Sequence, residues 1–262
     1  MNSKLGYTAF IRVVNETIPV IGLRSLGGGL GRGFGSLVII YGGSKEENFR
    51  FKVSDSLGDK LASLGFNVYC FDFRSNLDYS RFNEFGLYDR LEDAREVVRW
   101  VLEIEKAPIS LMGVSMGGSI AITLASELGH KIKNLFLVAP AAYHRDAMKP
   151  EVKFGPQFSE AIGKGKSEEN WHESNSFEEA KDVWANSLIL QFQEDQVVKR
   201  QILLDYWHNI GIRASNQSQN IRFRPLEGSH NGTYTDPQRQ EDMIRAIRDF
   251  LTLPSRVFTT HT

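Results

Sequence analysis

Short apolar runs alternate with amphipathic stretches along this chain. Five runs are apolar over the length of a strand, which is typical of strands buried on both faces of a parallel sheet. Residues 221–226 alternate between apolar and polar side chains, so this strand is expected nearer a sheet edge. Two earlier strands are predicted at residues 7–14 and 18–24. The five apolar runs cover residues 36–41, 67–72, 109–113, 134–139 and 187–192.

Between several of these strands the apolar residues have the spacing of a helix. Apolar side chains recur three, four and seven positions apart in three stretches, and each stretch predicts a helix with one buried face. The stretches are residues 88–105, the residues that follow Ser115, and a C-terminal segment with Met243 and Phe250. This alternation predicts an α/β fold in which helices cover both faces of a mostly parallel central sheet.

Residues 141–186 depart from this alternation of strands and helices. They are largely polar, with scattered aromatic side chains and no strand pattern. A long segment of this kind inside an α/β domain is usually functional. We therefore expect an α/β core formed by residues 1–140 and 187–262, with residues 141–186 inserted after the sixth strand as a lid or cap. The alternative is a poorly ordered surface excursion.

The glycine-rich residues 25–35 invite a phosphate-loop interpretation. The spacing G-x-G-x-x-G does not occur in these residues. They also precede a strand, whereas the dinucleotide-binding motif follows a strand. We interpret them as a flexible connection between strands, which argues against a nucleotide-binding protein.

Composition and charge limit the classes of binding partner and the cellular compartment to be expected. The 262 residues, 41% of them hydrophobic, suffice for one large domain with a sizeable core or for two small domains. A net charge of −1 argues against nucleic acid or an anionic membrane as partner. No signal peptide is evident, and no run approaches the roughly 18 apolar residues that span a bilayer. The single cysteine, Cys70, suits a reducing compartment, so we expect a cytoplasmic protein.

The strongest chemical signal is Gly113-Val-Ser-Met-Gly117, which matches G-x-S-x-G. A predicted strand enters the motif and a predicted helix leaves it. A sharp strand-to-helix turn exposes a serine hydroxyl, and small residues on either side tolerate the crowded backbone. Ser115 is therefore the predicted nucleophile.

A serine nucleophile needs a base and an acid that orients the base. Of the six histidines, His230 stands in a loop between the last predicted strand and the last predicted helix, where catalytic groups are common. The acid should lie between Ser115 and His230 in the chain, just past a strand. Asp195 is the first choice, because it lies further past the strand, and its neighbour Glu194 is the alternative.

With these residues the chain resembles the α/β-hydrolase family, in its branch of lidded esterases, lipases and serine aminopeptidases. The resemblance covers nearly the whole chain, and residues 141–186 lie where that branch carries its lid. It implies that the backbone N–H groups of Gly43 and Met116 form the oxyanion hole. The family often has a histidine where this chain has Tyr41. Asp72 and Arg74, which also match the family, are expected to form a structural ion pair or loop anchor.

These residues predict a serine hydrolase that cleaves carboxylic esters of small to medium acyl groups through an acyl-enzyme. The chemistry requires no metal and no organic cofactor, and the expected partner is a small-molecule acyl substrate. A thioesterase or acyltransferase would use the same acyl-enzyme and remains an alternative, as does a catalytically silent binding protein. The sequence leaves the oligomeric state open.

Overall fold

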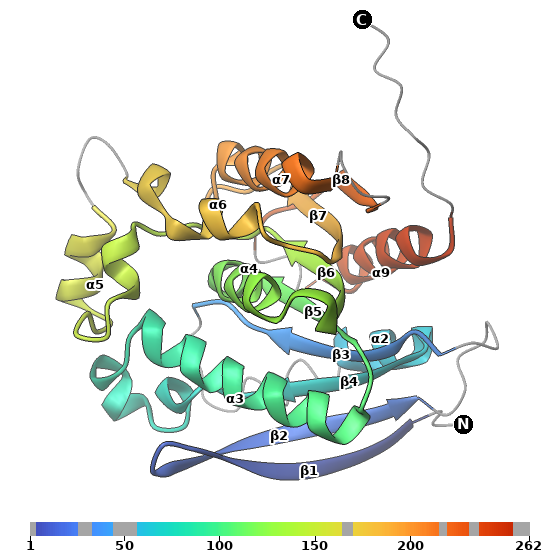
Figure 1. Ribbon diagram of the computed structural model, residues 1–262, viewed down its shortest axis with the longest axis horizontal. Helices are drawn as coiled ribbons and strands as arrows, with labels where there is room; N and C mark the ends of the chain where they lie inside the picture. The colour runs from blue at the N-terminus through green and yellow to red at the C-terminus, as the bar shows by residue number, and fades with distance from the viewer. Residues whose placement is uncertain are drawn as a thin grey trace, which may run out of the picture.

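All eight strands that the hydrophobic pattern predicts occur in the computed structural model, and they form one sheet (Figure 1). The structure describes residues 4–25, 33–43, 57–163, 170–214, 219–230 and 236–253. Most of the predicted glycine-rich connection therefore lies outside the described residues. The strands are β1 (Lys4–Val13), β2 (Glu16–Ser25), β3 (Gly35–Ile40), β4 (Phe66–Phe71), β5 (Ile109–Val114), β6 (Ile132–Val138), β7 (Asn186–Phe192) and β8 (Ile221–Leu226).

The strand order is β1-β2-β4-β3-β5-β6-β7-β8. β1 pairs antiparallel with β2, and β2 pairs antiparallel with β4. Every other pairing is parallel, so the mostly parallel sheet is confirmed, and β8 lies at an edge as its alternating pattern predicts. From β3 the chain passes to β4 on one side and then to β5 on the other. Such a reversal opens a crevice at the carboxyl ends of β3 and β5, and ligands of open α/β sheets bind in this kind of crevice.

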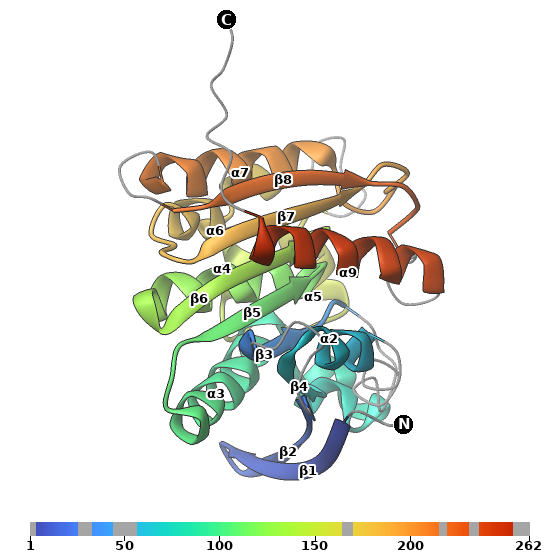
Figure 2. The ribbon, with the colours of Figure 1, turned by 90° about the vertical axis from the view of Figure 1, so that its right-hand side faces the viewer.

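Helices cover both faces of the sheet, as predicted (Figures 1 and 2). α2 and α9 lie on one face, and α3 and α4 lie side by side on the other. Within the described ranges, none of the helices is long and apolar enough to cross a membrane. The helices are α2 (Asp59–Leu64), α3 (Leu87–Glu105), α4 (Met116–Leu128), α5 (Pro156–Ala161), α6 (Asn175–Ala180), α7 (Arg200–Ala214) and α9 (Pro237–Thr252), with short 3-10 helices at Arg74–Asn76, Tyr79–Glu84, Gly129–Lys131, Arg145–Met148 and Trp171–Glu173.

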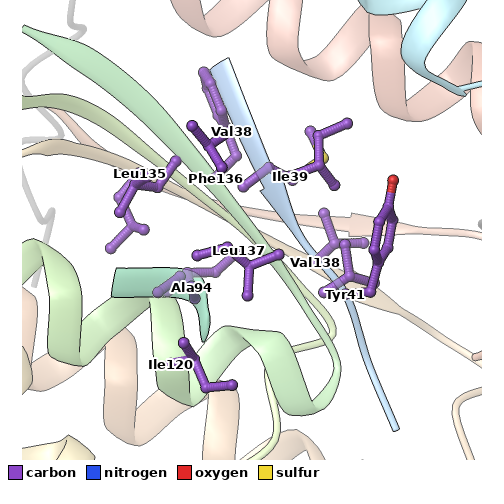
Figure 3. Packing of buried hydrophobic residues seen from close by; sticks show 14 of the residues in the cluster. Val38, Ile39, Tyr41, Ala94, Ile120, Leu135, Phe136, Leu137 and Val138 are labelled. Carbon is purple, nitrogen blue, oxygen red and sulfur yellow. The ribbon is translucent and has the colours of Figure 1, made fainter. Parts of the chain in front are cut away.

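Burial on both faces explains why the central strands are continuously apolar. In β6, Leu137 points toward Ala94 of α3 and Ile120 of α4 (Figure 3). Its neighbour Phe136 points to the opposite face, where its ring lies 6.0 Å from that of Phe250 in α9. Successive side chains of a strand alternate between faces, and here both faces are covered, so both positions are apolar.

The segment between β6 and β7 contains no strand in its described residues, 141–163 and 170–185. Four of its aromatic side chains are buried: Phe154, Phe158, Trp171 and Phe177. Its first half is attached to the core, because the amide of Phe154 donates to the carbonyl of Phe85 at 2.7 Å, just before α3. Burial of these rings favours an ordered segment over a surface excursion, while its role as a lid stays a prediction.

Candidate active site

Ser115 occupies a sharp turn between β5 and α4. Its φ of 52° lies in the left-handed region, which is uncommon for a residue other than glycine. The surrounding structure holds this conformation: the Ser115 amide donates to the Val138 carbonyl at 3.0 Å, and the Ser115 carbonyl accepts from Gly118 and Ala141, each at 2.9 Å. Strain maintained in this way is characteristic of functional sites.

The glycines of the motif are required by close packing. A Cβ atom at Gly117 would lie 2.2 Å from the carbonyl oxygen of Ile40, at the end of β3. A Cβ atom at Gly113 would lie 2.6 Å from that of Ala121, one turn into α4. The turn can therefore form against β3 only because these positions carry no side chain.

His230 lies in the loop that follows β8 and reaches the serine across the end of the sheet. Its Nε2 atom is 2.9 Å from Ser115 Oγ, and its Nδ1 atom is 2.8 Å from Asp195 Oδ2. The imidazole side chain is 12% exposed and the Asp195 side chain 5%. Residues that follow β5, β7 and β8 thus form a continuous hydrogen-bonded chain from hydroxyl to imidazole to carboxylate.

Asp195 is held as an ionised acceptor. Its Oδ1 atom accepts hydrogen bonds from the amides of Val197, at 2.8 Å, and Val198, at 2.9 Å. Burial alone would raise the pKa of Asp195, but the hydrogen bonds from His230 and the two valine amides outweigh it and hold the pKa below its usual value. Glu194, the alternative acid, is exposed to solvent.

Gly43 and Met116, whose amides are expected to form an oxyanion hole, come close together at the serine turn. Met116 is the first residue of α4, so its N–H has no acceptor within the helix. A Cβ atom at Gly42 would lie 3.0 Å from Ser115 Cβ, and one at Gly43 would lie 3.4 Å from Met116 Cε. The loop after β3 therefore packs directly against the serine turn, and the role of its amides stays a prediction.

Arg90 is a residue of this region that the hydrophobic pattern does not identify. It lies in α3 with 0% of its surface exposed, and its Nη1 atom donates to the Gly42 carbonyl at 2.8 Å. The signal was available: Arg90 and Asp93 stand among the buried apolar residues of α3, such as Leu87 and Val97. Charges on the apolar face of a helix indicate buried polar contacts.

Arg74 anchors its loop through Asp93 of α3, with its Nε atom 2.6 Å from Asp93 Oδ1. The Arg74 amide also donates to the other oxygen of the same carboxylate, at 2.8 Å. Asp72 is buried at the end of β4. The loop anchor expected at this position therefore exists, with Asp93 as the partner of Arg74.

A pocket of about 390 Å³ opens beside Ser115. Its wall is largely apolar and comes from the segment between β6 and β7, from the loop between β7 and α7, and from the start of α7. His144 adds a polar group, with its Nε2 atom 3.3 Å from Glu173 Oε2. The pattern of the sequence does not reveal this wall, because its residues are brought together by tertiary packing. The apolar lining includes Ala142, Phe158, Ile162, Trp171, Val198 and Ile202.

Two curated proteins are similar to part of this chain. A protein from monkeypox virus named monoglyceride lipase homolog is 31% identical over 113 residues, which are 40% of this chain and 38% of that protein. The mouse protein named lipase member M is 32% identical over 117 residues, which are 38% of this chain and 28% of that protein. The chain thus aligns with well under half of the length of these curated relatives.

A solved structure extends the likeness to the whole fold. An esterase from Pyrococcus furiosus superimposes with a TM-score of 0.63 at 18% identity, covering 95% of this chain and 92% of the esterase. The family model described as serine aminopeptidase, S33 (Hydrolase_4) matches residues 36–220, which is more than half of the chain. The chain therefore belongs to the serine aminopeptidase S33 family and is a member of the α/β-hydrolase superfamily.

Proposed function

We propose that this protein is a serine hydrolase that cleaves carboxylic esters of small to medium acyl groups through an acyl-enzyme. The observation that carries the proposal is the hydrogen-bonded chain from Ser115 Oγ through the His230 ring to the Asp195 carboxylate. A serine hydroxyl becomes a good nucleophile when a base within hydrogen-bond reach removes its proton.

In the proposed reaction, His230 takes the proton of Ser115 as Oγ attacks the ester carbonyl. The oxyanion of the tetrahedral intermediate accepts hydrogen bonds from the amides of Gly43 and Met116, and Asp195 stabilises the imidazolium. His230 then protonates the departing alcohol, and the acyl group stays on Ser115. Water, deprotonated by His230, attacks the acyl-enzyme, and the acid leaves as Ser115 regains its proton.

The pocket supports the choice of acyl group. Ligand pockets range over roughly 300–1,000 Å³, and the volume of about 390 Å³ beside Ser115 is near the lower limit. Apolar side chains such as Phe158 and Ile202 suit a hydrocarbon chain. In this proposal residues 141–186 act as the lid or cap of the acyl site. The similarity to the proteins named monoglyceride lipase homolog and lipase member M, and to the Pyrococcus furiosus esterase, supports ester substrates. The cytoplasmic location stays a prediction that rests on the single cysteine.

The test is a series of p-nitrophenyl esters from acetate to laurate, with the wild-type protein beside Ser115→Ala. We expect turnover with an optimum at short to medium chains and no turnover by the variant. Acyl thioesters, added alcohol acceptors and aminoacyl p-nitroanilides run in parallel identify a thioesterase, an acyltransferase or an aminopeptidase by the preferred substrate. Turnover that persists in Ser115→Ala would refute the mechanism. A wild-type protein that cleaves none of these substrates and resists a fluorophosphonate would be a silent binding protein.

A further inference from the structure

The guanidinium group of Arg90 lies behind the loop that is expected to bind the oxyanion. Its Nη1 atom donates to the Gly42 carbonyl at 2.8 Å and lies 3.4 Å from Met116 Sδ. Gly42 and Met116 come from separate elements, the loop after β3 and the first turn of α4. One nitrogen of Arg90 therefore contacts both sides of the proposed oxyanion hole.

The contact with Gly42 acts on the amide of Gly43. The carbonyl of Gly42 and the N–H of Gly43 belong to a single planar peptide unit, and no described peptide bond is cis. In a trans peptide the C=O and N–H point in opposite directions. A hydrogen bond that fixes the Gly42 carbonyl on the side of Arg90 therefore also fixes the direction of the Gly43 N–H on the other side. A cationic donor on the carbonyl also polarises the peptide and strengthens its N–H as a donor.

The guanidinium is itself held on several sides. Its Nε atom donates to Ser75 Oγ at 3.0 Å and its Nη2 atom to Asn76 Oδ1 at 3.2 Å, both in the loop after β4. Its central carbon lies 4.8 Å from the ring centre of Phe73 and 4.7 Å from that of Phe154. A planar group with donors on several edges can hold such a set of contacts at once, which a lysine ammonium cannot do.

Arg90 keeps its charge in this setting. Burial lowers the pKa of Arg90 to about 10, so the group is protonated at neutral pH. An arginine retained with no exposed surface is costly to desolvate, and such groups concentrate at functional sites.

We propose that Arg90 is a positioning residue that orients the Gly43 amide for the oxyanion and holds the loop after β3 against the side chain of Met116. The inference rests on the proposed function and adds to it a residue that touches neither the substrate nor the reacting atoms. Misplacement of oxyanion donors weakens binding of the transition state and leaves binding of the ground state unchanged.

Arg90→Lys and Arg90→Met test the proposal. The measurements are ester kinetics normalised to sites titrated with a fluorophosphonate, and inhibition by a trifluoromethyl ketone beside the matching methyl ketone. The fluorinated ketone forms a tetrahedral adduct with an oxyanion, whereas the methyl ketone reports ground-state binding. We expect kcat per titrated site to fall about 10- to 100-fold with KM nearly unchanged, and affinity for the fluorinated ketone to fall by the same factor. Affinity for the methyl ketone should stay near the wild-type value.

Arg74→Lys is the matched control, because Arg74 is also a buried arginine and pairs with Asp93 of α3, the helix that carries Arg90. It should lower the Tm and leave kcat per titrated site near the wild-type value. If neither Arg90 variant folds, the double variant Ser75→Ala/Asn76→Ala removes two of the hydrogen bonds that hold the guanidinium and keeps Arg90 itself. That double variant should show a smaller loss in the same two quantities.

The outcomes separate this inference from the function on which it rests. Unchanged kcat per site and unchanged affinity for the fluorinated ketone in the folded Arg90 variants, or in the double variant when they do not fold, would overturn the role of Arg90 alone. An equal loss in Arg74→Lys would also overturn it, because the effect would then be one of general packing. A wild-type protein without turnover and without labelling would overturn the proposed function, and the role of Arg90 with it.

Discussion

His230 Nε2 lies 2.9 Å from Ser115 Oγ although 115 residues separate the two along the chain. Both residues follow parallel strands, β8 and β5, whose carboxyl ends open on the same edge of the sheet. The sheet therefore supplies the proximity, and the loops that follow the strands supply the orientation.

Asp195→Asn should lower kcat about 10⁴-fold with little change in structure, because an amide leaves the imidazole in the wrong tautomer and cannot stabilise imidazolium. Steady-state kinetics with the best p-nitrophenyl ester measure the effect. Glu194→Gln, one residue away and exposed, is the control and should be nearly neutral. A larger loss in the Glu194 variant than in the Asp195 variant would assign the acid to Glu194.

The lowered pKa of Asp195 predicts a pH dependence of stability. A carboxyl group whose pKa is lower in the folded than in the unfolded state stabilises the fold above the unfolded pKa, about 3.9, and loses this contribution as the pH falls through the folded pKa. The difference in free energy of unfolding between wild type and Asp195→Asn should thus shift against the wild type as the pH falls from about 5 to below about 4. Urea unfolding across this range measures it. A difference that instead moves in favour of the wild type on acidification would contradict the hydrogen-bonded carboxylate.

Gly117→Ala should destabilise the protein by about 3 kcal/mol or prevent folding, because the new methyl group would overlap the backbone of β3. Gly211→Ala is the matched control. Gly211 lies within α7 and a Cβ atom there meets nothing within 4 Å, so alanine should stabilise the helix by roughly 0.5–1 kcal/mol. Urea unfolding of both variants gives the two free energies. Equal effects of the same sign would show that close packing does not dictate the glycine at 117.

Ile202→Phe should shorten the preferred acyl chain, because the larger ring enters the pocket beside Ser115. We expect kcat/KM for the longest accepted ester to fall about 10-fold or more while that for acetate stays near wild type, since pocket contacts of one or two methylenes discriminate on this scale. Ile212→Phe, which changes an isoleucine of the same helix that is 45% exposed, is the control. An unchanged chain-length profile in Ile202→Phe would place the acyl group elsewhere.

The sequence predicted the strands well because parallel strands covered on both faces must be apolar at every position, as Leu137 and Phe136 illustrate. The strand order was not predictable in the same way. The position of β4 between β2 and β3 depends on contacts between distant segments, which no local pattern encodes.

The residues of the candidate site also differ in whether a local sequence pattern identifies them. Ser115 stands in a local motif that specifies its own turn, so five neighbouring residues suffice to identify it. The apolar wall of the pocket has no local signature, and the charge of Arg90 on the apolar face of α3 indicates a buried polar contact without identifying its partners. Arg90 lies on a helix face that the periodicity assigns to the core, and its partners Gly42, Ser75 and Asn76 come from two other loops. Only the tertiary structure brings these groups together.

The most direct test of the central claim is the site of covalent labelling by a fluorophosphonate, read by mass spectrometry of the digested protein. We expect one adduct per chain, on Ser115, in the wild-type protein, and a rate of labelling that falls sharply in His230→Ala. An adduct on another residue, or labelling of Ser115 at an unchanged rate without His230, would contradict it.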